Sequence, residues 1–161
     1  MFRAWESNNQ PLVIPNGVTT ISHNAFSYWE SNNQPLVIPD SVITIGHSTF
    51  SNWKSNNHPL VIPNSVTTID NYAFSRWESN NHPLVIPNSV TTIGFGVFEF
   101  WKIVPYIEMK RTTPPTINID TFNHQNDAPI YVPDASLNAY KTATNWVNYA
   151  NRIFPVSEKE V

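Results

Sequence analysis

Apolar and polar positions along this chain follow a pattern that repeats every 24 residues. The best-preserved stretch is Trp29–Pro39, with the sequence WESNNQPLVIP, and near copies begin at Trp5, Trp53 and Trp77. A repeat of this length is typical of a solenoid, in which each repeat forms one coil that buries its apolar side only against its neighbours. The pattern therefore predicts one elongated domain of about five to six stacked coils.

Large apolar residues return at the same position of each coil, and we expect them to form the rows of a stacked core. These residues are Phe2, Phe26, Phe50, Phe74, Phe98 and Phe122; Leu12, Leu36, Leu60 and Leu84; Ile14, Ile38, Ile62 and Ile86; Val18, Val42, Val66 and Val90; and Ile21, Ile45, Ile69 and Ile93.

The segment PLVIP predicts a short strand in each coil. Side chains alternate between the two faces of a strand, so Leu12 and Ile14 should point inward and Val13 outward. A proline at each end removes a ladder donor and stops the strand from growing. The β-branched segment Val18–Ile21 predicts a second short strand. The next residues, 24–27, are too few for an ordinary α-helix and predict a single 3₁₀ turn.

The repeat decays towards the C-terminus. We predict four 24-residue repeats over residues 1–104, with no N-terminal cap, then divergent final repeats over 105–133 and a helical cap over 134–161. The three parts should form one continuous structural domain. Asp134 is a good N-cap, and Leu137, Tyr140, Trp146 and Tyr149 follow it with helical spacing. Such an amphipathic end is expected to shield the last coil.

Composition narrows the function. Charged residues make up 13% of the chain, about half the usual share, and the net charge is −3. Lys and Arg do not cluster, which disfavours nucleic acid as a partner. No apolar run approaches the length needed to cross a bilayer, and no signal peptide is recognisable. With no Cys, disulfides, thiolate nucleophiles and zinc-thiolate sites are excluded.

The chain resembles the BspA-like leucine-rich repeats of bacterial surface proteins. The match is carried by Leu36–Gly46 (LVIPDSVITIG), by the Ala25-Phe26 and Ala73-Phe74 pairs, and by Ile130–Asp134 (IYVPD) in the tail. One departure is that Trp stands in every coil where the family has Cys. The resemblance implies a leucine-rich repeat solenoid: a right-handed parallel β/α superhelix of mostly short strands and 3₁₀ turns, with a C-terminal helical cap.

By the same resemblance, the domain is expected to be secreted or displayed on a bacterial cell, as a non-enzymatic module for adhesion or protein recognition. The expected partner is a protein or a host-matrix surface. Two alternatives are a carbohydrate-binding module and a structural spacer for an upstream domain. An uncapped first coil would also expose apolar residues, which predicts self-association.

The outward side chains of the PLVIP strands, with the residue before each first proline, form the predicted binding face. The carbohydrate alternative uses the Trp column as an aromatic stripe. We expect no metal, cofactor or catalytic residue, because His residues lack a repeated third ligand and no acidic pair is set up for catalysis. The predicted face comprises Val13, Val37, Val61, Val85, Gln10, Gln34, His58 and His82, and the alternative stripe comprises Trp5, Trp29, Trp53, Trp77 and Trp101.

Overall fold

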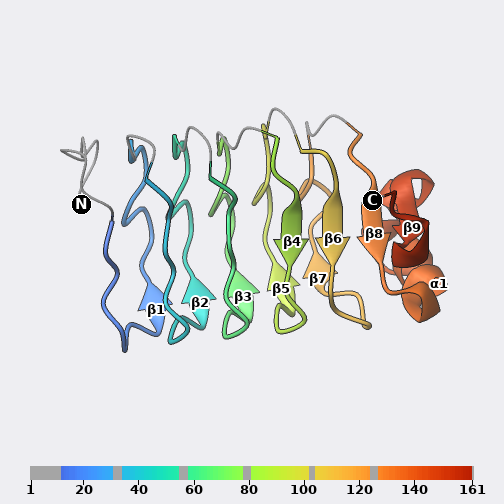
Figure 1. The fold of residues 1–161 in the computed structure, drawn as a ribbon, viewed down its shortest axis with the longest axis horizontal. Coiled ribbons are helices and arrows are strands. Elements are labelled where there is room, and N and C mark those ends of the chain that lie inside the picture. Colours follow the sequence, from blue (N-terminus) through green and yellow to red (C-terminus); the bar gives the residue numbers. More distant parts are fainter. Residues whose placement is uncertain are drawn as a thin grey trace.

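The structure is a computed structural model that describes residues 12–30, 34–54, 58–77, 81–101, 104–123 and 127–160. Figure 1 shows the coils side by side in chain order, with the C-terminal helices against the last coil. Each strand pairs in parallel with the strand one coil further along. This is the predicted solenoid of short strands.

The first sheet consists of five two-residue strands in the order β1-β2-β3-β5-β7. In each step Thr pairs with Thr and Ile pairs with Ile. The Ile row is buried, while the Thr row is half or fully exposed. The strands are β1 (Thr20–Ile21), β2 (Thr44–Ile45), β3 (Thr68–Ile69), β5 (Thr92–Ile93) and β7 (Thr116–Ile117).

The second sheet contains the PLVIP strands and has the order β4-β6-β8-β9. Its strands are β4 (Leu84–Ile86), β6 (Ile107–Met109), β8 (Ile130–Val132) and β9 (Ile153–Pro155). The predicted strand is thus present in the fourth coil, whereas the described part of the first two coils has only a single bridge, between Val13 and Val37.

The prolines explain why this sheet is strongest near the C-terminus. The N–H of Lys110 donates to the carbonyl of Ile86 at 2.9 Å. Lys110 follows Met109, which pairs with Ile86, so it occupies the place that Pro87 has in the preceding coil. Proline has no N–H to offer, so this bond cannot form between the earlier coils.

The residues after the first sheet form turns instead of the predicted 3₁₀ turn. Asn24 and Tyr28 have φ values of 54° and 61°, in the left-handed region that a 3₁₀ helix excludes. Their N–H groups donate to the carbonyls of His47 and Ser51 in the next coil, at 2.9 and 2.8 Å. A further ladder of coil-to-coil hydrogen bonds therefore runs along these turns, and it imposes the unusual backbone.

Two stacked ladders of aromatic rings fill the core. The described Phe column, 26 to 122, has ring centroids 5.5 to 6.1 Å apart from coil to coil. The Trp column, 29 to 101, has spacings of 5.4 to 6.2 Å. Within each coil the Phe ring meets the Trp ring edge to face. Stacked and edge-to-face contacts are both favourable for aromatic pairs.

The C-terminal segment closes the solenoid. It forms η1 (Asp134–Ser136), α1 (Leu137–Thr142), η2 (Trp146–Arg152) and η3 (Val156–Glu158), with β9 between the last two. Trp146 is buried and donates from Nε1 to the carbonyl of Pro115 at 2.8 Å. The Tyr140 hydroxyl likewise donates to the carbonyl of Arg111 at 2.8 Å. Large side chains with polar tips thus cover the last coil and satisfy its carbonyl groups.

The Phe ladder should contribute strongly to stability. Phe74 is fully buried between Phe50 and Phe98, so Phe74→Ala is expected to lower the free energy of unfolding by about 3–5 kcal/mol. Urea denaturation followed by circular dichroism measures the loss. Phe100→Ala is the matched control, because that ring is 40% exposed; equal losses in the two variants would contradict the ladder's role.

Candidate functional site

The valine row (Val13, Val37, Val61 and Val85) lies on the outward face of the PLVIP segments, as predicted. Val13, Val37 and Val61 are 75%, 61% and 62% exposed, whereas Val85 is half-buried. The Leu and Ile residues on either side of each of these valines point into the core, apart from the half-buried Leu12. The alternation of a strand thus leaves one methyl-bearing side chain per coil in water.

The polar part of the predicted face lies beside this row. Gln34, His58 and His82 are half-buried, and Gln10 lies outside the described residues. Their position directly before the first proline of each PLVIP segment places them next to the valine row. A continuous face of one apolar and one polar column therefore extends over the described coils.

The sequence analysis missed the aromatic end of this face, formed by Tyr106, Tyr131 and Phe154. The register of the second sheet carries the column of Val85 to Glu108, Tyr131 and Phe154. The Tyr131 ring lies 5.8 Å from that of Tyr106 and 6.3 Å from that of Phe154. These residues line a hollow of about 490 Å³. The alignment of IYVP with LVIP contained the signal, because it places Tyr131 in the valine column.

Glu108 interrupts the valine column with a buried charge. Its side chain forms ion pairs with Lys110 and, at 2.8 Å, with the Nζ of Lys159 in the C-terminal segment. Burial alone would raise the pKa of Glu108, but hydrogen bonds from the two lysines outweigh it and hold the pKa below the ordinary value. Lys159 also lies 4.9 Å from the centre of the Tyr106 ring. The cluster therefore fixes the C-terminal segment beside the aromatic end.

The Trp column does not form an exposed stripe. Trp53, Trp77 and Trp101 are only 1–2% exposed and Trp29 is half-buried, while Trp5 lies outside the described residues. The rings stack on one another along the core, so the alternative site is wrong for the three buried residues. A ring face enclosed by other rings is not accessible to a sugar.

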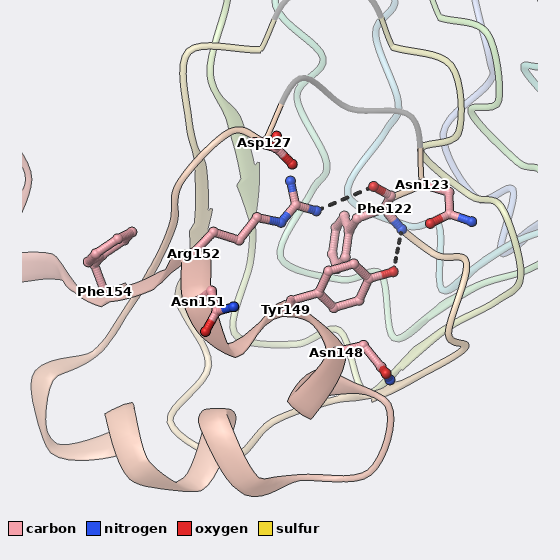
Figure 2. Close-up of a pocket in the computed structure, with 8 residues that line it drawn as sticks. All are labelled: Phe122, Asn123, Asp127, Asn148, Tyr149, Asn151, Arg152 and Phe154. Carbon is pink, nitrogen blue, oxygen red and sulfur yellow. Dashed lines mark hydrogen bonds between the residues drawn. The ribbon is translucent and has the colours of Figure 1, made fainter.

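Figure 2 shows a hollow of about 540 Å³ where the C-terminal cap meets the last coil. Its most polar side chains serve the fold. The Arg152 guanidinium donates to the carbonyls of Phe122 and Ala128, both at 3.3 Å. The Tyr149 hydroxyl accepts from the N–H of Phe122 and donates to the carbonyl of Ile119. Burial lowers the pKa of Arg152 and raises that of Tyr149. The hollow is therefore mainly a structural junction.

The His residues show no metal-binding arrangement. The rings of His23 and His47 lie 6.0 Å apart, and His23 Nε2 is 4.0 Å from an Asp70 oxygen. Over the ranges that the structure describes, no group of three or more His, Cys, Asp or Glu side chains could hold a metal ion. In the same ranges, no helix is long and apolar enough to cross a membrane.

Repeated short parallel strands, inward Leu and Ile columns and a C-terminal helix define a leucine-rich repeat solenoid. The sequence matches the model of the BspA type leucine-rich repeat region in six copies over residues 2–134. The chain therefore belongs to this family, whose members are generally linked to surface binding and are generally non-catalytic. A comparison with curated proteins finds no match.

The Glu108 cluster leads to a pH prediction. Since its pKa is lowered in the folded state, the ion pairs stabilise the fold above the unfolded pKa near 4.5 and are lost as the pH falls through the folded pKa. Glu108→Gln should lower the free energy of unfolding by about 1 kcal/mol at pH 7. Urea titrations should show the gap to the unsubstituted protein closing at acid pH, and a gap that is constant with pH would contradict the prediction.

Proposed function

We propose that this domain is a non-enzymatic recognition module of a bacterial cell surface that binds a protein partner through the valine row and its aromatic end. The observation that carries the proposal is the row of exposed valines on successive coils. Three apolar side chains that are more than half exposed, in one line, form a surface on which a partner can exclude water. Membership of a family linked to surface binding supports this role.

The aromatic end adds the anchor residues that such a surface needs. Tyr residues are enriched among the side chains that dominate protein interfaces, because a large rigid ring buries much area and its hydroxyl finds a polar partner. Tyr106 and Tyr131 are both half-buried and lie against each other. Their rings are held in place before a partner arrives, which reduces the ordering cost of binding.

The backbone beneath this face is also rigid. In the second sheet the N–H of Leu84 donates to the carbonyl of Tyr106 at 3.1 Å, and that of Ile107 donates to the carbonyl of Pro129 at 2.9 Å. The inward side chains of the same strands are fully buried. A partner would therefore meet a surface that does not need to fold on binding, and specificity would come from the spacing of the rows.

The prediction is that charges on the valine row abolish partner binding. The double variant Val37→Glu/Val61→Glu should bind immobilised purified matrix proteins at least tenfold more weakly, about 1.4 kcal/mol or more, because the partner would have to desolvate two carboxylates. Surface plasmon resonance against untreated, protease-treated and deglycosylated matrix proteins measures this.

The control is Thr44→Glu/Thr68→Glu, which adds the same charge to half-exposed residues of the first sheet. Both double variants should keep the circular dichroism spectrum of the unsubstituted protein. Binding that is equally weak in both variants, or that disappears only after deglycosylation, would sink the proposal of a protein partner on this face.

A further inference from the structure

The four repeats that start at Trp5, Trp29, Trp53 and Trp77 differ mainly in one short segment. Over their first 17 positions, five columns vary, whereas six of the last seven columns vary. Two of those columns hold four different residues each. They are the first turn column (Asn24, Ser48, Tyr72 and Gly96) and the second turn column (Tyr28, Asn52, Arg76 and Phe100). Variation is thus concentrated in the turns, on a coil that is otherwise almost constant.

The same two columns have left-handed backbone throughout. Their φ values lie between 51° and 62° at all eight positions. Glycine and asparagine suit this conformation, whereas a bulky side chain is strained there by about 1–2 kcal/mol per residue. A turn selected only for stability would therefore hold Gly or Asn in every coil. Tyr28, Arg76 and Phe100 depart from that choice, which points to a use for their side chains.

These turns line a groove of about 380 Å³ that crosses the coils. The first turn column supplies one side of the lining and the second turn column the other, while the buried residues Ser27, Ser51 and Ser75 lie between them in the sequence of each coil and also line it. Glu99 belongs to the lining at the C-terminal end, where the Arg76 guanidinium lies 4.9 Å from the centre of the Phe100 ring. The groove therefore combines a row of hydroxyl groups with aromatic and amide side chains.

The groove has little backbone left to offer a ligand. The N–H groups of Asn24, Tyr28 and Arg76 already donate to carbonyls of the next coil, at 2.8–2.9 Å. A peptide that added to the coil as an extra strand would need free N–H and carbonyl groups at a sheet edge. Recognition here must therefore come from side chains, which the backbone ladder holds in fixed positions.

The side chains favour a neutral, hydroxyl-rich ligand. Serine and tyrosine hydroxyls and asparagine amides can both donate and accept hydrogen bonds, as sugar hydroxyls require. Tyr28 is 57% exposed, so its ring can pack against the apolar face of a pyranose. The positive Arg76 and the negative Glu99 lie in the same lining and offset each other. An anionic ligand is therefore not preferred over a neutral one.

We propose that this turn groove is a second binding site, which takes a neutral linear oligosaccharide lying across the coils with one sugar ring against Tyr28. It is separate from the proposed protein-binding face, because it is built from the turns that follow the first sheet and not from the PLVIP strands. The carbohydrate function expected of the Trp column is thereby moved to the residues that immediately precede it.

The test uses a variant that should fold better and bind worse. Tyr28→Asn places a residue that tolerates left-handed backbone, so the thermal unfolding midpoint should rise by about 2–4 °C. The same change removes the ring, so affinity for neutral oligosaccharides should fall at least tenfold. The probes are cello-, chito-, malto- and manno-oligosaccharides of two to six residues, measured by isothermal titration calorimetry on the whole chain.

The outcomes separate the two proposals. Val37→Glu/Val61→Glu should keep oligosaccharide binding, and Tyr28→Asn should keep binding of protein partners. The site is overturned if none of these oligosaccharides binds the unsubstituted protein, or if Tyr28→Asn binds them equally well. Binding that is restricted to anionic glycans would also overturn the proposed ligand class.

Discussion

Aromatic stacking from coil to coil is the interaction on which the rest of the structure depends. The Phe and Trp rings meet their counterparts 5.4 to 6.2 Å away, and this is possible only when each repeat has the same length. One inserted residue would move a ring out of its column and turn the following strand over. Constant coil length therefore follows from the core, and rows of identical groups on the surface follow from constant coil length.

The same constraint settles where the backbone hydrogen bonds go. The first sheet and the turns bond from coil to coil throughout the described repeats, while the prolines weaken the PLVIP ladder in the earlier coils. Because the turns must present N–H groups to the next coil, residues such as Tyr28 and Arg76 adopt left-handed backbone against their own preference. Local strain is thus balanced by hydrogen bonds and by burial of the adjacent Phe and Trp rings.

Sequence reasoning succeeded where a single physical rule decides. Alternation within PLVIP placed Leu36 and Ile38 inside and Val37 outside, and the period gave the solenoid. It failed at the turns, because no local propensity predicts φ above zero for Tyr28 when only a bond to Ser51, 23 residues away, imposes it. The ion pair of Glu108 with Lys159 also joins residues that are 51 positions apart, so neither residue's neighbours reveal it.

The two surfaces divide along the line between constant and variable positions. The valine row repeats one side chain, so each additional coil that a partner covers adds a similar increment of buried apolar area. Such a row gives strength but does not distinguish one coil from the next. The turn columns carry a different residue in each coil, and they alone can fix the position of a ligand along the axis. A domain made of near-identical coils therefore gains specificity at the strained turns, where the core and the strand pairing tolerate different side chains.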